Sequence, residues 1–208
     1  METKQNCAFR LIYTCSPVDV ENGIHIGSYR YYLGTKLGDQ LRAQLPDNLD
    51  FVVPVPNSGL YYAMGLSHAA GIPYLQALVK PCGSKRTLPE SDLEKRGQMI
   101  EQSITLLPNL IQGKRVVLVD EAIFTGTTLR LVCGKLRRCG AAGIYICIPT
   151  SPCVSPCPLL PQKSLLAQRL SPEEMRRFFQ ADGLWFLDSD TFRSNTAQFG
   201  PVCTLCFQ

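Results

Sequence analysis

The residue types most able to do chemistry in this chain lie in one stretch, 116–128, with the sequence VVLVDEAIFTGTT. Its four leading apolar residues predict a buried parallel strand over 115–120. Two carboxylates end that strand, those of Asp120 and Glu121. A loop of threonines and glycine then leads into a helix predicted over 129–138. A strand, a polar loop and a helix in this order are typical of a phosphate-binding site.

The loop between this strand and helix has the donors that a phosphate needs. Backbone N–H groups at a helix start point toward an anion, and threonine hydroxyls add to them. Asp120 and Glu121 can accept hydrogen bonds from two neighbouring sugar hydroxyls, or approach a divalent metal. A phosphate and a vicinal diol together indicate a ribose 5-phosphate; the alternative is an ordinary turn after a parallel strand.

Length and composition indicate one α/β domain. The chain has 208 residues, 45% hydrophobic and 18% charged, which is the profile of a globular protein with a full core. A net charge of +4 is too mild to favour nucleic acid, and a basic pocket for a small polyanion accounts for part of it. No apolar run approaches the roughly 18–20 residues of a membrane span, and the N-terminus lacks the apolar core of a signal peptide. We therefore expect a cytoplasmic protein that binds no membrane.

The rest of the chain predicts strands that alternate with helices, as in a central, mostly parallel sheet flanked by helices. Segment 80–100 is different, because it is charged, contains glycines and prolines, and lacks an apolar period until its last residues. We expect a flexible lid over the site there; a solvated insertion without a role is the alternative. The other predicted strands are 7–15, 51–55, 74–79, 144–148 and 183–187, and the other helices are 28 to before Pro46, 60–70 and one capped by Ser171.

Ten cysteines are many for a chain expected in a reducing compartment, where disulfides are rare. Cys133, Cys139 and Cys147 lie in or beside a predicted helix and strand, where a small buried hydrophobe is the simplest role. Others lie toward the chain ends, in proline-rich or irregular surroundings, and segment 149–208 is the cysteine-rich C-terminal part. Metal binding and a core that tolerates cysteine are the two interpretations.

The 116–128 motif resembles the signature of type I phosphoribosyltransferases, which bind phosphoribosyl pyrophosphate (PRPP). Nearly the whole chain is similar, more specifically, to the phosphoribosyltransferase domain of glutamine PRPP amidotransferases, which begin purine biosynthesis. The resemblance implies the type I phosphoribosyltransferase fold as a single domain over 1–208. The segments that carry it are 28–30 with Gly34 and Gly38, 55–58, 71–74, 79–80, 86–87, 126–128 and 181–184.

The resemblance also implies roles for site residues. The 5-phosphate would be held by Phe124, Thr125, Gly126, Thr127 and Thr128. Asp120 and Glu121 would bind the ribose hydroxyls, and together with Ser58 they would hold Mg²⁺. This sparse set suits an ion that keeps several of its waters and also binds substrate oxygens.

The leaving pyrophosphate has its own implied residues. Asn57, Ser58 and Gly59 would form the pyrophosphate loop. Lys80 and Arg86 would act as the catalytic cations that neutralise the departing group.

One branch of the resembled family holds a [4Fe–4S] cluster on four cysteines. Cys7, Cys157, Cys203 and Cys206 are in the matching places here. Four thiolates suit an iron–sulfur cluster or zinc, and zinc is the alternative metal. Cys153 is the alternative to Cys157. Such a site would join the two chain ends to the domain.

The chain also departs from the family pattern. Glu121 stands where a second aspartate is usual, followed by Ala122 in place of serine, and Thr125 replaces an arginine. Asn57 replaces an acidic residue, and Lys85 stands where glycine usually precedes an Arg-Thr pair. These departures affect the identity of the acceptor more than the fold.

The resemblance therefore implies an enzyme that transfers the phosphoribosyl group of PRPP to ammonia or a related small nitrogen nucleophile, releasing pyrophosphate. The family enzymes carry an N-terminal glutaminase domain, and this chain begins about where that domain would end. We therefore expect either ammonia from a separate glutaminase subunit or a specialised metabolite as the acceptor, and we expect a homo-oligomer. The alternatives are a non-catalytic PRPP or nucleotide sensor or regulatory subunit, and a nucleobase salvage phosphoribosyltransferase.

Overall fold

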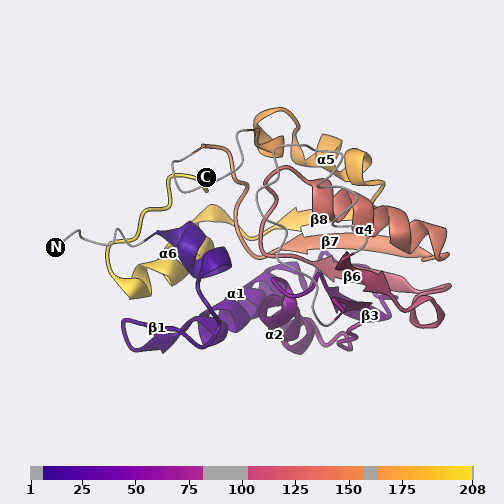
Figure 1. Cartoon of the computed structure of the whole chain (residues 1–208), viewed down its shortest axis with the longest axis horizontal. Coiled ribbons are helices and arrows are strands. Elements are labelled where there is room, and N and C mark those ends of the chain that lie inside the picture. Colours follow the sequence, from indigo (N-terminus) through magenta and orange to yellow (C-terminus); the bar gives the residue numbers. More distant parts are fainter. Residues whose placement is uncertain (1–6, 82–102, 157–163, 208) are drawn as a thin grey trace.

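The computed structural model describes residues 7–81, 103–156 and 164–207. At its centre is a four-stranded sheet covered by helices on both faces (Figure 1). All three strand pairs are parallel, so all four carboxyl ends lie at the same edge of the sheet. In spatial order the strands are β3 (Phe51–Pro54), β6 (Arg115–Val119), β7 (Gly143–Ile148) and β8 (Gly183–Phe186).

Successive residues of each strand point to opposite faces of the sheet. Val117 and Val119 pack against α1 and α2, whereas Val116 and Leu118 pack in the layer of α4 and α5. Because both faces are covered, the strands are apolar throughout, which explains why the sequence predicts them. The helices are α1 (Ile26–Leu41), α2 (Leu60–Ala70), α4 (Thr127–Arg138), α5 (Pro172–Phe179) and α6 (Ser189–Thr196).

Most of the predicted elements are confirmed. Helix α2 has the predicted bounds, and α1 and α4 each begin two residues earlier than predicted. Ser171 caps α5 as expected, because its hydroxyl accepts from Glu174 N at 3.3 Å while the Glu174 carboxylate accepts from Ser171 N at 2.8 Å. This reciprocal capping box fixes the helix start.

Two predicted strands need correction. The predicted strand 7–15 is wrong, because Arg10–Thr14 forms a π-helix, η1. A short apolar run fits a strand or a buried helical turn equally well, and its neighbours decide between them. In the predicted strand 74–79, only Leu78–Val79 (β4) is a strand, and it pairs antiparallel with β5 (Thr105–Leu106).

The remaining elements were not predicted. Two short strands, β1 and β2, form an antiparallel hairpin before α1. They and the short 3₁₀ helices have these bounds: β1 Val20–Glu21, β2 Ile24–His25, η2 Pro108–Leu110, η3 Leu166–Gln168 and η4 Ala197–Phe199.

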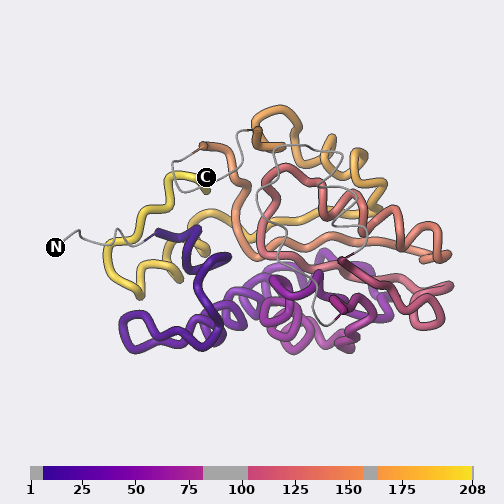
Figure 2. Tube along the Cα trace, in the orientation of Figure 1, coloured from indigo at the N-terminus to yellow at the C-terminus, as the bar shows by residue number. Residues whose placement is uncertain are grey.

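The two ends of the described chain lie side by side, as the indigo and yellow segments of Figure 2 show. Cys7 and Cys203 form a parallel bridge, and Ala8 N donates to Cys203 O at 3.0 Å. No helix in the described ranges combines the length and apolarity needed to cross a bilayer. The predicted lid at 80–100 falls almost wholly outside the described residues.

Candidate active site

The predicted site lies at the carboxyl edge of the sheet, where β3 and β6 end side by side. Val55 N donates to Val119 O at 2.8 Å, which keeps the loop after β3 against β6. In that loop, Ser58 Oγ donates a hydrogen bond to Asp120 Oδ1 at 2.9 Å. The structure thus brings together the predicted pyrophosphate loop and the predicted ribose-binding carboxylates.

Gly59 allows this loop to lie so close to β6. A Cβ atom at this position would lie only 2.3 Å from Val119 O and 3.0 Å from Val55 O. Gly59 N donates to Val55 O at 2.9 Å, so the backbone itself closes the turn. Asn57 is exposed and follows a cis peptide bond. The loop therefore exposes Asn57, while the absence of a side chain at Gly59 lets the loop lie against the sheet.

Asp120 and Glu121 are both buried, with 5% of each residue exposed. Glu121 N donates to Asp120 Oδ1 at 3.0 Å, whereas Glu121 Oε2 has no hydrogen-bond partner among the described residues. Burial, together with the charge of Glu121, holds the pKa of Asp120 well above its ordinary value. A buried acceptor without a partner calls for an explanation, and a ligand hydroxyl or a cation would supply one.

The loop that follows the carboxylates has the features of an anion site. Gly126 has a φ of 76°, in the left-handed region, and it turns the chain into α4. Thr125 Oγ1 and Thr127 Oγ1 are 3.0 Å apart, Thr127 N donates a long hydrogen bond to Thr125 Oγ1 at 3.5 Å, and Gly126 at the N-cap has no side chain to cap α4. The first-turn N–H groups of this helix are thus directed at the loop.

A single pocket joins the loop to both carboxylates and contains every residue that the sequence predicted for the phosphate loop. Its lining residues are Tyr13, Asp120, Glu121, Ala122, Ile123, Phe124, Thr125, Gly126, Thr127, Thr128 and Leu129.

Tyr13 is the lining residue that the sequence reasoning missed. Its ring contacts Phe124 edge-on, with centroids 6.1 Å apart, and Phe9 contacts Phe124 in the same way at 5.6 Å. The predicted strand over 7–15 concealed this role. Phe9 and Tyr13 are four residues apart, a spacing that places two side chains on one side of a helix or of a strand, so the sequence alone did not reveal it.

The described part of the chain does not confirm the roles of the two predicted catalytic cations, Lys80 and Arg86. Lys80 follows β4, and Tyr74, earlier in that segment, bridges Val52 of β3. Lys80 is not one of the described residues that line the pocket. Arg86 lies outside the described residues, so both roles stay predictions.

The predicted cysteine cluster is not supported. Within 7–81, 103–156 and 164–207, no three His, Cys, Asp or Glu side chains gather as a metal site, and no disulfide forms. Cys7 and Cys206 instead lie in the apolar core beneath α1 and α2, and Cys203 is partly exposed. Cys157 lies outside the described residues. Cys153, its alternative, is buried, and its backbone pairs with Phe207.

Comparison with known proteins agrees with this geometry. Residues 27–152 match the phosphoribosyl transferase domain. The chain belongs to the phosphoribosyltransferase family. The amidophosphoribosyltransferase of Methanothermobacter thermautotrophicus is 32% identical to it over 208 residues, which cover 98% of this chain and 43% of the relative.

Solved structures show the same phosphoribosyltransferase fold. Glutamine PRPP amidotransferase from B. subtilis, complexed with ADP and GMP, matches the whole chain with a TM-score of 0.82 and 29% identity, over 47% of its own length. A second structure, described as the allosteric regulatory enzyme of purine biosynthesis, also matches with a TM-score of 0.82 and 29% identity, over 100% of this chain and 46% of that one. The α/β fold expected from the motif is confirmed. The chain spans less than half the length of the amidophosphoribosyltransferase relatives named above.

The predicted role of the 124–128 loop in phosphate binding can be tested with two glycines. Gly126 and Gly140 both have positive φ, 76° and 78°, but only Gly126 lies in the pocket. Replacing Gly140 by alanine should lower the free energy of unfolding by about 1–2 kcal/mol, because L residues are strained there. Gly126→Ala should lower it further, because its Cβ atom would lie 2.8 Å from Leu166 Cδ2 and 3.0 Å from Phe179 Cε1. Only Gly126→Ala should also weaken PRPP binding, roughly tenfold, the equivalent of one lost hydrogen bond to a charged group. Calorimetric titration and thermal unfolding measure both effects, and an equal loss of affinity in Gly140→Ala would contradict the loop assignment.

Proposed function

We propose that this chain binds PRPP and transfers its phosphoribosyl group to ammonia or a related small nitrogen nucleophile, with release of pyrophosphate. The observation that carries the proposal is the Ser58–Asp120 hydrogen bond, 2.9 Å long. It joins the loop expected to hold the pyrophosphate to the carboxylates expected to hold the ribose, beside the start of α4. The names of the relatives support the same reaction class.

The arrangement suggests how each part of PRPP would bind. The 5-phosphate would accept hydrogen bonds from the 124–128 loop and the first turn of α4. The ribose hydroxyls would donate to Asp120 and to Glu121, whose Oε2 atom has no partner among the described residues. The pyrophosphate would then lie over the loop that contains Ser58.

For this reaction the protein must position the substrate and the nucleophile and stabilise the charge that develops on the ribose and the pyrophosphate. Loss of pyrophosphate leaves positive charge on the ribose ring, and the carboxylates of Asp120 and Glu121 would favour that charge electrostatically. Binding at both ends of the substrate would hold the anomeric carbon in place for the nucleophile. Lys80 and Arg86 are the cations proposed to neutralise the leaving group.

The donor set at this edge fits Mg²⁺. Ser58 Oγ, Asp120 and the unsatisfied Glu121 Oε2 are hard oxygen ligands, the kind that Mg²⁺ prefers. When bound, Mg²⁺ would neutralise negative charge on the pyrophosphate. A nearby cation would also favour the ionised form of Asp120, whose pKa burial now raises.

The acceptor and the partners of the chain are proposed as well. Relatives named amidophosphoribosyltransferase support a nitrogen acceptor, and a separate glutaminase subunit is the proposed source of ammonia in a step of purine biosynthesis. A homo-oligomer is proposed as well. The departures at Asn57, Glu121, Ala122 and Thr125 are the reason to test other amines and nucleobases beside ammonia.

The decisive experiment measures pyrophosphate release from PRPP and Mg²⁺ by anaerobically purified protein, with and without ammonium. Release that depends on ammonium is the expected result. Release with a nucleobase alone would favour a salvage enzyme. PRPP binding without turnover of ammonium, amines or nucleobases would contradict the enzyme and favour the sensor, and no binding would exclude both.

Iron–sulfur or zinc binding by Cys7, Cys157, Cys203 and Cys206 is a separate proposal, on which no step of the reaction depends. It requires the chain ends to lie together, and the backbones of Cys7 and Cys203 pair. The described cysteines do not form such a site by themselves. Iron and zinc analysis of the anaerobic protein, with its absorbance near 400 nm, tests the proposal, and protein free of both metals would contradict it.

A further inference from the structure

One wall of the pocket comes from the N-terminal helical segment, residues 8–14, here called the wall segment. Tyr13 belongs to it and lines the pocket beside the phosphate loop. Phe9, one turn earlier, packs against Tyr13 with ring centroids 5.5 Å apart, and both contact Phe124. The position of this segment therefore determines the shape of the pocket on that side.

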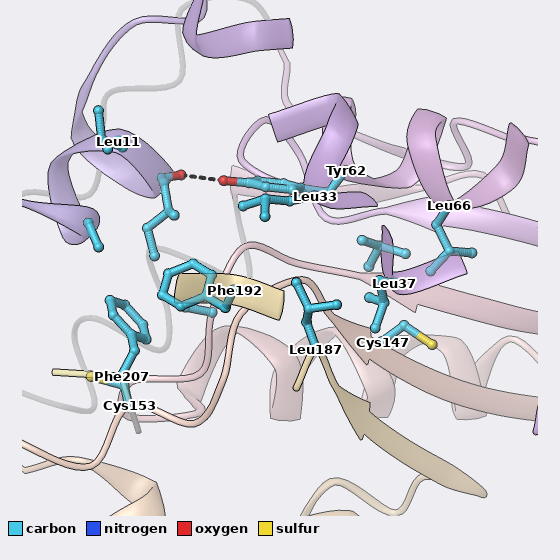
Figure 3. Close-up of a cluster of buried hydrophobic side chains, with 14 of the residues drawn as sticks. Leu11, Leu33, Leu37, Tyr62, Leu66, Cys147, Cys153, Leu187, Phe192 and Phe207 are labelled. Atoms are coloured by element: carbon cyan, nitrogen blue, oxygen red, sulfur yellow. Dashed lines mark hydrogen bonds between the residues drawn. The ribbon is translucent and has the colours of Figure 1, made fainter. Parts of the chain in front are cut away.

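The carboxyl end of the wall segment is held by side chains from α1 and α2. Arg30 Nε donates to Leu11 O at 3.0 Å, and Arg30 Nη2 donates to Cys15 O at 2.8 Å. Tyr62 OH donates to Ile12 O at 2.9 Å, the dashed line in Figure 3. Three backbone carbonyls at a helix end, which lack partners within the helix, are thus bonded to two side chains.

Because Arg30 and Tyr62 are buried, their donors depend on these hydrogen bonds. Arg30 is 4% exposed and Tyr62 is 0% exposed. A buried guanidinium or hydroxyl is destabilising unless its donors are paired. A positive charge is also favoured beside the carbonyl end of a helical segment. Arg30 and Tyr62 therefore fix the wall segment in one position rather than merely touching it.

We propose that Arg30 and Tyr62 are positioning residues for the active site, which hold the wall segment so that Tyr13 closes the pocket beside the phosphate loop. The inference rests on the proposed function, because it concerns the binding of PRPP in that pocket. Neither side chain lines the pocket itself, so both act through the backbone of residues 11–15.

Tyr29 provides a matched control. It is also a tyrosine of the α1–α2 layer, 1% exposed, and its hydroxyl shares a hydrogen bond of 2.7 Å with Thr196 Oγ1. Thr196 ends α6, which does not contribute to the pocket lining. Tyr29→Phe and Tyr62→Phe each remove one buried hydroxyl, but only Tyr62→Phe releases the wall segment.

The experiment compares these two variants and Arg30→Lys with the wild type. Hydrogen exchange follows the amides of residues 8–15, including Cys15 N, which donates to Arg10 O at 2.9 Å. Calorimetry follows the affinity for PRPP, and thermal unfolding follows stability. Tyr62→Phe should speed exchange in the wall segment and weaken PRPP binding on the order of tenfold. Arg30→Lys should act in the same direction, because lysine cannot bond two carbonyls with one planar fork.

Tyr29→Phe should lower the Tm by a similar amount and leave both exchange in 8–15 and PRPP affinity unchanged. Equal losses of affinity in Tyr29→Phe and Tyr62→Phe would overturn the inference, as would an unchanged affinity in Tyr62→Phe. A wild-type protein that binds no PRPP would instead overturn the proposed function, and the wild-type titration separates the two failures.

Discussion

Replacing Asp120 by asparagine is expected to lower kcat/KM for pyrophosphate release from PRPP by about a thousandfold, without loss of stability. Asp120 lies at the end of β6, accepts from Ser58 Oγ at 2.9 Å, and is 5% exposed. Asparagine keeps the size and one acceptor, but it removes the charge that would favour a cationic ribosyl group or a bound Mg²⁺. Steady-state kinetics at saturating Mg²⁺ provide the measurement.

Although Asp120→Asn should lower activity, it should raise the free energy of unfolding, by an amount that depends on pH. Burial and Glu121 raise the folded pKa of Asp120 above its unfolded value, so the folded state binds its proton more tightly. Between the two pKa values the folded protein therefore holds more protons, and its stability falls as pH rises. The Asp120→Asn variant lacks this contribution. It should be more stable than the wild type at neutral pH, and the difference should shrink as pH falls toward the ordinary pKa of aspartate.

Asp188→Asn is the matched control for this substitution. Asp188 also follows a strand of the same sheet, β8, and it caps α6 by accepting from Thr191 N at 2.8 Å. Asparagine is an equally good N-cap, so activity and stability should both stay near the wild-type values. If Asp120→Asn retained more than about a tenth of wild-type kcat/KM, Asp120 would not be an essential ligand of ribose or metal.

The sheet could be predicted because its signals are local. β6 and β7 are buried on both faces, so each is a continuous apolar run that needs no knowledge of its neighbours. The Ser171 capping box is another local signal, since both of its hydrogen bonds join residues three apart. The hairpin of β1 and β2 also had such a signal, the Asn22-Gly23 pair with positive φ at both residues, which is typical of a two-residue hairpin turn.

The wall segment could not be predicted, because distant residues determine its conformation. Its carbonyls are bonded by Arg30 and Tyr62, which are 19 and 50 residues from their partners Leu11 and Ile12. Nothing within the segment itself distinguishes a buried strand from a buried helical turn.

Parts of the candidate site could likewise be predicted from the sequence, and other parts could not. The loop containing Ser58 and the carboxylate of Asp120 could be expected to meet, because carboxyl ends of parallel strands share one edge. The place of Tyr13 depended on the wall segment and was missed. The cysteine prediction required the side chains of Cys7, Cys203 and Cys206 to converge, and backbone neighbours need not have converging side chains.

Gly34→Ala is expected to lower the free energy of unfolding by about 3 kcal/mol. A Cβ atom on Gly34 would lie 2.0 Å from Tyr62 O and 2.7 Å from Tyr62 C. Gly65 makes the reciprocal approach, with its Cβ position 2.0 Å from Tyr31 O. These are backbone atoms within helices, so α1 and α2 must move apart. For a chain of this size, the Tm should fall by roughly 6–12 °C.

Gly134→Ala is the control, and it is expected to stabilise the protein and not to destabilise it. Gly134 lies inside α4, and a Cβ atom there would meet only Arg138 Nη1, at 3.5 Å. Alanine should therefore stabilise the protein by about 0.5–1 kcal/mol, its ordinary advantage over glycine in a helix. A similar loss of stability in both variants would show that the close approach of α1 and α2 is not what requires glycine at position 34.

The Gly34 substitution also reaches the active site through one residue. The backbone that Gly34 contacts belongs to Tyr62, whose hydroxyl holds Ile12 O of the wall segment at 2.9 Å. When α2 moves away from α1, Tyr62 and Arg30 can no longer hold the wall segment from their present positions. Gly34→Ala should therefore speed hydrogen exchange in residues 8–15 and weaken PRPP binding even well below its Tm. Normal exchange and affinity in a destabilised Gly34→Ala protein would separate the packing of the two helices from the shape of the pocket.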